Sequence, residues 1–315
     1  MIAGIITKRL LSLAAVLFVV SVLIFMLGTL IPGDLTSVLV GQEGATQEQF
    51  EEVRKRLGLD QPLIAQYFHW LTAAVQGDLG TSPITGRNVS TDLAQQIPVS
   101  ADLAILTLIF STLIGVPIGI IAAVHANKRT DVAARAILLT IFSIPVFVIG
   151  IVLLLVVSAV APELVQVSYI PFTDDPVGNL RSIALPVMAI TLPFAAMTMQ
   201  LTRSAMLEVL GNPFIVTARA VGVRSTRIHY LHALRNALPP LVTFLGFQFG
   251  VMLGGLIIVE QLFGLPGLGR GLLEAINNRD YPAVTATTMV FAIAFVLINA
   301  VIDILYPILD PRQRR

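Results

Sequence analysis

Six long apolar runs dominate this chain, and they restrict it to folds that a lipid bilayer accepts. An α-helix needs about 20 apolar residues to cross the hydrocarbon core of a bilayer. The runs cover residues 10–30, 99–124, 133–160, 183–207, 238–263 and 286–306. Hydrophobic residues make up 56% of the 315 positions and charged residues only 12%, a composition typical of membrane proteins. We therefore expect an all-α membrane protein with six transmembrane helices.

The first run has a second interpretation, as the core of a cleaved signal peptide. A signal core has about 7–15 apolar residues and is followed by a cleavage site of small residues. Residues 10–30 form a longer run, and no such site follows it. The pattern therefore favours a membrane span.

Lysine and arginine residues near the ends of the runs indicate the orientation of the chain. Cytoplasmic loops of membrane proteins carry an excess of these residues. They lie before the first run, between the second and third, between the fourth and fifth, and after the sixth: Lys8, Arg9, Lys128, Arg129, Arg135, Arg203, Arg219, Arg224, Arg227, Arg235, Arg312, Arg314 and Arg315. With six spans, these four regions share one side of the membrane, so both termini are predicted to be cytoplasmic.

The runs divide the chain into four parts. These are a tail with the first span (1–30), an external segment (31–98), a core of five spans (99–307) and a basic cytoplasmic tail (308–315). The core contains a cytoplasmic loop, 208–236, and an external loop, 264–285.

The external parts are predicted to contain short amphipathic helices. A capping-box spacing at 46–49 indicates one helix, and Pro62 and Gly77 bound a second that places Ile64, Tyr67, Leu71 and Val75 on one face. These helices either form a cap on the bundle or lie on lipid headgroups. In the external loop, the dense glycines of 263–270 predict a tight turn or a close backbone approach, followed by an amphipathic segment over 272–277.

Among the segments that connect the runs, the cytoplasmic loop contains the clearest signals for the start and end of helices. Asn212 is a good N-cap, Pro213 fits the first helical position, and Gly222 favours the left-handed conformation that ends a helix. We expect a short helix over 213–221, and a second helix capped by Ser225 that continues towards Pro239. The exposed basic helix suits docking to a protein and attraction to anionic lipid equally well.

The sequence lacks the usual motifs of catalysis and of metal binding. There is no phosphate-binding G-x-x-x-x-G-K-[ST] loop, no H-E-x-x-H, no G-x-S-x-G and no cysteine. His229 and His232 lie three residues apart, which alone is weak evidence for a metal site. We expect no catalytic residue, metal or cofactor in this chain. The net charge of +1 gives no indication of a nucleic-acid partner.

A few polar side chains lie inside the runs, where they are costly and often functional. Asp102, Glu260 and Asp303 lie near the ends of runs, so no relay of ionisable groups crosses the membrane centre. The candidates for lining a translocation path are Gln200, Gln248, Glu260 and Asn299. Hydrogen bonding between helices is the favoured alternative for the neutral residues among them.

Several segments together resemble a known family. Residues 217–222 (TARAVG) with 232–238 (HALRNAL) look like the cytoplasmic EAA loop of ABC-type importer permeases. The external pieces 31–34 (IPGD), 57–62 (LGLDQP) and 77–80 (GDLG) resemble the first permease, or B-type branch, of dipeptide and oligopeptide importers. Residues 263–269 (FGLPGLG) and 279–282 (RDYP) extend the likeness almost to the C-terminus.

The resemblance implies a fold, partners and site residues. The fold would be that of a type I importer permease in the bacterial cytoplasmic (inner) membrane. The partners would be a second homologous permease, one or two P-loop ATPase chains that bind ATP and magnesium, an extracytoplasmic binding protein, and a peptide substrate. The helix that docks on the ATPase would use Pro213, Phe214, Thr217, Ala218, Arg219, Ala220 and Gly222. The binding protein would contact Asp78, Gly267, Arg270, Arg279, Asp280 and Tyr281.

This chain departs from the general EAA pattern, because Val216 and Thr217 stand where the broader family has glutamate before the alanines. The departure weakens any expectation of a glutamate contact. Two alternatives to peptide import remain at this point. One is import of a nickel chelate, glutathione or another small solute through the same architecture, and the other is an independent secondary carrier or channel.

Overall fold

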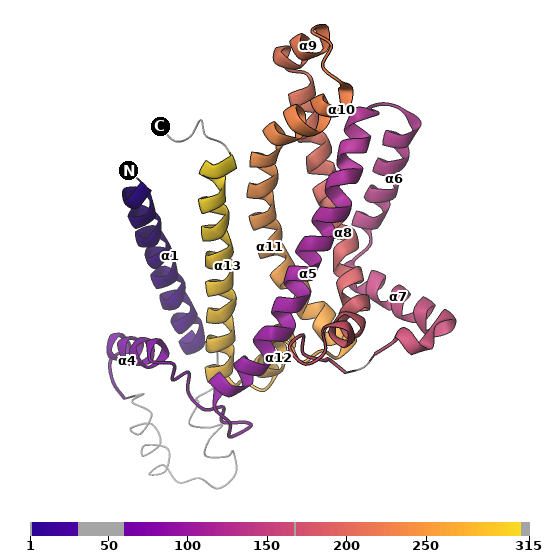
Figure 1. Cartoon of the computed structure of the whole chain (residues 1–315). Helices are drawn as coiled ribbons and strands as arrows, with labels where there is room; N and C mark the ends of the chain where they lie inside the picture. Colours follow the sequence, from indigo (N-terminus) through magenta and orange to yellow (C-terminus); the bar gives the residue numbers. More distant parts are fainter. Residues whose placement is uncertain (1, 31–59, 167, 310–315) are drawn as a thin grey trace. The chain divides into compact units, whose positions relative to one another are not determined.

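The computed structural model describes residues 2–30, 60–166 and 168–309 (Figure 1). In those ranges the chain is helical, apart from short connections and one isolated bridge between Thr81 and Asn88. It divides into two compact units, Met1–Ile97 with Arg270–Val296, and Pro98–Gly269 with Leu297–Arg315. The helix predicted from the capping-box spacing at 46–49 lies outside the described residues.

The first unit contains a helix pair held by aromatic residues. Helix α4 (Leu63–Val75) packs on α1 (Ile2–Leu30), and the buried Tyr67 hydroxyl shares a hydrogen bond of 2.8 Å with the Ser21 hydroxyl. The rings of Phe18 and Phe25 meet Tyr67 edge to face, with centroids 6.2 Å and 5.5 Å away. The helix bounds that Pro62 and Gly77 predicted are confirmed, since Pro62 is the N-cap and Gly77 has φ 87°.

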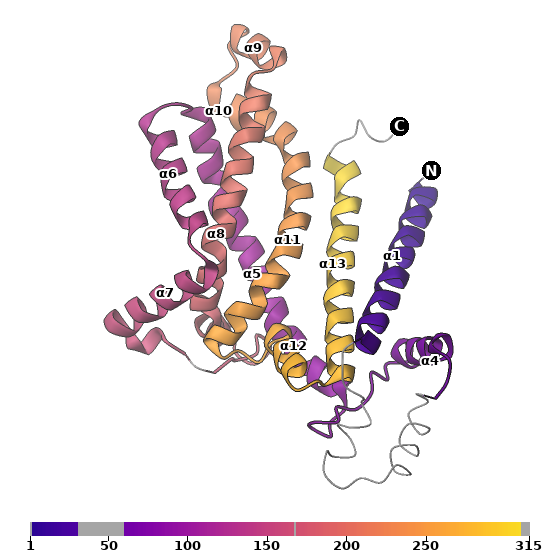
Figure 2. The ribbon, with the colours of Figure 1, turned by 180° about the vertical axis from the view of Figure 1, so that it is seen from behind.

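The second unit contains most of the apolar helices (Figure 2). Its elements are α5 (Val89–Val124, from Pro98), α6 (Arg129–Ser143), α7 (Val146–Val160), the 3-10 turn η1 (Pro162–Leu164), α8 (Pro176–Leu210), α9 (Pro213–Ala220), α10 (Ser225–Arg227), the π-helix η2 (Ile228–Leu234), α11 (Arg235–Phe263) and the end of α13 (Tyr281–Leu309). Helix α8 is central, because it contacts α6, α7 and α11 and is buried along most of its length. Its core partners include Leu103, Met252 and Leu256, which are fully buried.

Two glycines allow α5 and α8 to approach at backbone distance. A β-carbon on Gly115 would lie 2.7 Å from the Ala195 carbonyl oxygen, and one on Gly119 would lie 2.7 Å from that of Met199. The two glycines are four residues apart, so they lie on the same face of α5. This G-x-x-x-G spacing is a common packing motif of membrane helices.

The third predicted span, 133–160, is not a single straight helix. The segment consists of α6 and α7, which meet at a bend of 99°. Ile144 between them is extended, with φ −91° and ψ 125°, and Pro145 is the N-cap of α7. Proline disfavours the helical conformation of the residue before it and has no N–H to donate, and this explains the break.

The other apolar helices are longer than the runs that predicted them. Helix α5 begins ten residues before position 99, and α13 begins at Tyr281 rather than at 286. Four helices in the described residues are long and apolar enough to cross a membrane, or five if the bent pair forms one span. Helix α1 contributes a shorter apolar stretch, Leu13–Met26. The prediction of six spans with cytoplasmic termini therefore stays a prediction.

Candidate functional site

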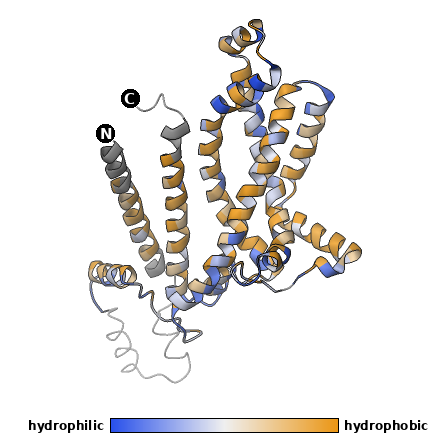
Figure 3. Ribbon diagram, viewed as in Figure 1, coloured by the Kyte–Doolittle hydropathy of each residue, from blue (hydrophilic) through white to orange (hydrophobic). Residues whose placement is uncertain are grey.

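Helix α9 lies at the end of α8, where polar residues are concentrated (Figures 1 and 3). It begins at Pro213, as predicted, and ends at Ala220, one residue before the predicted end. Asn212 occupies the N-cap position but does not cap with its side chain. Its Nδ2 donates instead to the Glu208 carbonyl at 3.1 Å, in the preceding helix. That hydrogen bond ties the start of α9 to the last turn of α8.

The C-terminal end of α9 is a Schellman motif centred on Gly222. Gly222 has φ 82°, its N–H donates to the Arg219 carbonyl, and the Val223 N–H donates to the Ala218 carbonyl, both at 3.0 Å. This is the hydrogen-bond pattern that a left-handed residue after a helix produces. The predicted left-handed stop at Gly222 is confirmed.

The side chains of α9 are exposed over a wide arc. Ile215 is fully buried and anchors the helix, whereas Phe214 is 45% exposed and Val216 is 60% exposed. At about 100° per residue, Phe214 and Val216 point about 160° apart around the helix axis. Thr217, Arg219 and Ala220 are also exposed. Helix α9 is therefore held by one buried side chain and presents more than one face.

The segment after α9 differs from the expected second helix. Arg224, not Ser225, is the N-cap of α10, and no side chain caps it. The helix was predicted to run towards Pro239, and it continues beyond that residue. It becomes the π-helix η2 and continues as α11 through Pro239 and Pro240.

A buried ion pair joins α6 to α8 in the same unit. The Arg203 guanidinium donates to both carboxylate oxygens of Asp131, at 2.6 Å and 2.8 Å. Asp131 is fully buried and also accepts from the Asn127 N–H at 2.8 Å, in the turn between α5 and α6. From the sequence, Arg203 was counted only among the basic residues that indicate the orientation of the chain. The two partners lie 72 residues apart, so no local pattern indicated their pairing.

Two of the candidate path residues are buried between helices. The Gln248 amide accepts from the Thr198 hydroxyl at 3.1 Å and donates to the Phe194 carbonyl at 3.3 Å, which joins α11 to α8. The fully buried Glu260 carboxylate accepts from the Ser100 hydroxyl at 2.6 Å, and that hydroxyl accepts from the Leu268 N–H at 2.8 Å. Of the other two, Gln200 is exposed and Asn299 is half-buried. A path-lining role stays a prediction for all four: Gln200, Gln248, Glu260 and Asn299.

The glycines of the turn after α11 allow a close approach, as their density predicted. Gly264 ends α11 with φ 67°, and a β-carbon on Gly267 would overlap the Glu260 carboxylate. Glu260 therefore lies directly against the turn. The predicted amphipathic segment 272–277 is part of a longer helix, α12 (Leu268–Asn277).

The predicted contacts for a binding protein differ in exposure. Asp78 and Arg279 are exposed and Arg270 is half-buried, whereas Gly267, Asp280 and Tyr281 are buried. In the first unit, Asp280 accepts hydrogen bonds from the Ser82 hydroxyl and from the Ala283 N–H, so it shapes the start of α13. Asp280 and Ser82 also line a small polar pocket of about 130 Å³. The docking role of these residues stays a prediction.

A further polar cluster fixes the connection before α8. Asp102 on α5 accepts from the Tyr169 hydroxyl at 2.7 Å and from the Asn179 amide at 2.9 Å. Asn179 also donates to the Ile170 carbonyl at 2.8 Å. Burial and the neighbouring Asp102 raise the pKa of Tyr169. Asp102 is therefore a structural acceptor in this unit.

Comparison with known proteins agrees with this architecture. Residues 115–315 match the family described as binding-protein-dependent transport system inner membrane component, and residues 1–104 match the N-terminal part of such membrane components. The glutathione transport system permease protein GsiC of Escherichia coli K12 is 38% identical over 307 residues, which cover 98% of this chain and 97% of that protein. The GsiC protein of Salmonella choleraesuis gives the same values.

Two solved transporters share the fold. A structure of the MetNI methionine ABC transporter in an inward-facing conformation superposes with a TM-score of 0.57 at 19% identity, over 69% of this chain and 96% of that chain. An amino acid ABC transporter with histidines superposes with a TM-score of 0.50 at 18% identity, over 69% and 94%. The chain thus belongs to the binding-protein-dependent transport system inner membrane components, as an integral membrane permease subunit of an ABC importer.

Proposed function

We propose that this chain is the first permease of a peptide importer and that α9 is its coupling helix. One observation carries the coupling role: α9 is a short helix that ends in a Schellman motif and whose side chains are exposed over about 160° or more of its circumference. A flat lipid surface covers one face of a helix, whereas a protein groove surrounds it. The width of the exposed arc favours the groove.

The groove belongs to a separate ATPase subunit, which binds ATP and magnesium. A second, homologous permease supplies the other half of the path, and an extracytoplasmic binding protein delivers the solute. In this arrangement the present chain hydrolyses nothing. It provides half of the path and transmits the movement of the ATPase through α9 to α8 and α11, the helices to which α9 is connected.

The proposed cargo class is small peptides, and glutathione, itself a tripeptide, is included. The resemblance to dipeptide and oligopeptide permeases and the 38% identity to GsiC support this class. A binding protein sets much of the selectivity in such systems, so cargo is best identified through that partner. Competition between labelled glutathione and unlabelled di- and tripeptides for uptake by the assembled complex would separate the two cargoes.

The proposed topology has six spans with both termini in the cytoplasm of a bacterium, and it treats the bent pair α6–α7 as one crossing. The chain contains no cysteine, so a single introduced cysteine is the only thiol in it that a labelling reagent can modify. Cysteines placed at Thr226 and at Asp78 should react with a membrane-impermeant maleimide from opposite sides of the membrane. Labelling of both positions from the same side would contradict the topology.

Affinity purification of the chain from its native membrane in mild detergent tests the assembly. We expect stoichiometric recovery of a second permease, of ATPase chains and, with cargo present, of a binding protein. Recovery of this chain alone, with solute transport retained after reconstitution into liposomes, would identify an independent carrier instead.

A further inference from the structure

Helix α4 in the first unit carries an exposed apolar stripe. We define the stripe by Ile64, Phe68, Leu71 and Val75, which lie within about 60° of one another around the helix axis, at about 100° per residue. Ile64 is 73% exposed, Phe68 54% and Val75 81%, and Leu71 is half-buried. Tyr67, which the sequence placed on the same face, is instead buried against α1. The stripe therefore borders the side of α4 that contacts α1.

The contacts of Tyr67 fix the level of α4 along α1. Its hydroxyl shares a hydrogen bond with Ser21, and its ring meets those of Phe18 and Phe25. These three residues of α1 all lie inside the apolar stretch Leu13–Met26. Helix α4 thus packs against the part of α1 that faces hydrocarbon when α1 lies in a membrane.

The surface of α1 at this level is apolar as well. Val19, Leu23 and Met26 are 55%, 54% and 51% exposed. Lipid acyl chains cover such side chains in a membrane helix, because no water reaches the hydrocarbon core. The exposed stripe of α4 lies at the same level, so it extends the apolar surface that α1 begins.

The length and composition of α4 suit a helix that lies along a membrane. Its 13 residues span about 20 Å, which is less than the hydrocarbon core of about 30 Å, and Figure 1 shows it crossing α1 rather than running beside it. The exposed polar residues His69 and Gln76 lie about 140° and 120° around the axis from Ile64. The Thr72 hydroxyl donates to the carbonyls of Phe68 and His69, at 2.8 Å and 2.9 Å, so the helix itself satisfies it.

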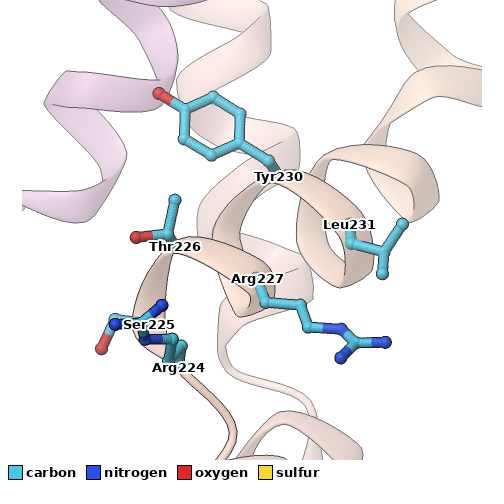
Figure 4. Close-up of a pocket in the computed structure, with 6 residues that line it drawn as sticks. All are labelled: Arg224, Ser225, Thr226, Arg227, Tyr230 and Leu231. Atoms are coloured by element: carbon cyan, nitrogen blue, oxygen red, sulfur yellow. The ribbon is translucent and has the colours of Figure 1, made fainter.

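Charge plays no part in this surface, because α4 contains no lysine, arginine, aspartate or glutamate. The hollow of about 760 Å³ in the second unit is the contrasting case, since Arg224 and Arg227 line it (Figure 4). A phosphate or a carboxylate can pair with such arginines. On α4, the only attraction that the exposed stripe offers is apolar contact.

We propose that α4 is an in-plane membrane helix whose apolar stripe lies among the acyl chains of the leaflet at the C-terminal end of α1. Of the two positions that the sequence left open for this helix, lipid is the one that its level along α1 favours. The inference rests on α1 being a membrane helix, and it is independent of the cargo and of the coupling role of α9. It ties the segment before α5 to the membrane boundary.

A protein partner is the competing occupant of the stripe. Protein interfaces are enriched in tyrosine and tryptophan, and in α4 these residues, Tyr67 and Trp70, contact α1 instead. The stripe itself offers only aliphatic and phenyl groups, which acyl chains match.

The test uses the full chain in nanodiscs of phosphatidylcholine, with a bimane fluorophore on a single introduced cysteine. Ile64→Cys places the label on the stripe, and His69→Cys, also at an exposed position of α4, is the matched control. We expect brominated phosphatidylcholine to quench the label at Ile64 about twofold or more over the label at His69, and aqueous iodide to show the reverse order. Trp70 is the only tryptophan of the chain, so brominated lipid should also quench the fluorescence of the protein without any substitution.

Three results would overturn the proposal. Equal quenching of both labels by iodide would place α4 in water. Loss of quenching by brominated lipid at Ile64 once the permease is assembled with its partners would show that a protein covers the stripe. A requirement for phosphatidylglycerol would show that charge, rather than apolar contact, holds the helix. Failure of the coupling role of α9 would leave the quenching of both labels unchanged.

Discussion

The carboxylate of Asp131 and the guanidinium of Arg203 face each other with two parallel hydrogen bonds, 2.6 Å and 2.8 Å long, in the interior of the second unit. Asp131 is the third residue of α6, and Arg203 lies seven residues before the last residue of α8. The pair therefore attaches the turn after α5 to the helix that leads into α9. Arg135 approaches the same carboxylate at 3.4 Å.

Replacement of Arg203 by leucine should destabilise the protein strongly. It leaves the Asp131 carboxylate buried with a weaker partner, and an uncompensated buried charge costs about 3–5 kcal/mol. The free energy of unfolding in mild detergent measures this loss. Arg203→Leu combined with Asp131→Leu should recover most of it, because a paired apolar replacement leaves no buried charge.

A matched control is Arg87→Leu. Arg87 forms an ion pair of 3.0 Å with Asp92, but its side chain is 62% exposed, so the loss should stay within about 1 kcal/mol. If Arg203→Leu also costs no more than this control, the Asp131–Arg203 pair is not a significant source of stability.

Arg219→Pro should uncouple solute uptake from ATP hydrolysis. A proline inside α9 removes a backbone hydrogen bond and disturbs the preceding turn, at a cost of about 3 kcal/mol or more to the helix. Arg219→Ala retains the helix and removes only the charge, so it should keep coupling. Solute transported per ATP hydrolysed is the measurement, and wild-type uptake by an assembled Arg219→Pro complex would exclude α9 as the coupling helix.

Gly222→Val should strain the end of α9 without any steric clash. No heavy atom lies within 4 Å of a β-carbon at this position, so the cost is confined to the backbone at φ 82°. That cost is about 1–2 kcal/mol for a left-handed non-glycine residue and more for a β-branched one. Gly222→Asn should be tolerated better, because asparagine also occurs at this cap. Equal ATPase binding by both variants and the wild type would show that the cap geometry is not needed for docking.

Gly267→Ala should displace the turn after α11. Its new methyl group would overlap the buried Glu260 carboxylate, and overpacking of this kind costs about 1–3 kcal/mol. Gly267→Ala combined with Glu260→Ala removes the overlap and should recover part of the loss, whereas Gly254→Ala, where nothing lies within 4 Å, should cost little. Thermal unfolding of the purified complex measures all three. No difference between Gly267→Ala and Gly254→Ala would contradict the close approach.

Gln248→Leu distinguishes a packing role from a path-lining role. Hydrogen bonds between membrane helices average about 0.6 kcal/mol, so we expect a small loss of stability and an unchanged KM for the cargo. Gln200→Leu, at an exposed position, serves as the comparison. A rise in KM without a loss of stability would place Gln248 on the path instead.

Local chemistry in the sequence was sufficient to predict the short helices. Pro62 and Gly77 bound α4, and Pro213 and Gly222 bound α9, because proline and glycine restrict the backbone through their own covalent structure. The residues next to these prolines and glycines have little effect on where the two helices begin and end. The same reasoning therefore predicted the candidate docking helix almost to the residue.

The break between α6 and α7 shows where local reasoning ends. Pro145 separates two helices, whereas Pro117 and Pro193 lie inside the continuous helices α5 and α8. Which proline ends a helix depends on the surrounding helices, which either satisfy or fail to satisfy the freed carbonyl groups. That information is not local.

Hydrogen bonds between residues far apart in the sequence also could not be predicted from local patterns. Arg203, Thr198 and Ser100, which hydrogen-bond to Asp131, Gln248 and Glu260 respectively, lie between 50 and 160 residues away from them in the sequence. The G-x-x-x-G spacing of Gly115 and Gly119 was a usable local indication, although it does not identify α8 as the partner. The sequence thus revealed which polar residues were unusual but not which residues contact them.

The backbone contact of α5 with α8 at Gly115 and Gly119 has a mechanical consequence. Two helices that touch at their peptide groups have no layer of side chains between them, so a larger residue at either glycine would push the two backbones apart. A movement of α9, at the end of α8, would therefore also reach α5 through this backbone contact. If α9 is the coupling helix, the element that moves with it would be the α5–α8 pair, held in contact at two positions that lack a β-carbon.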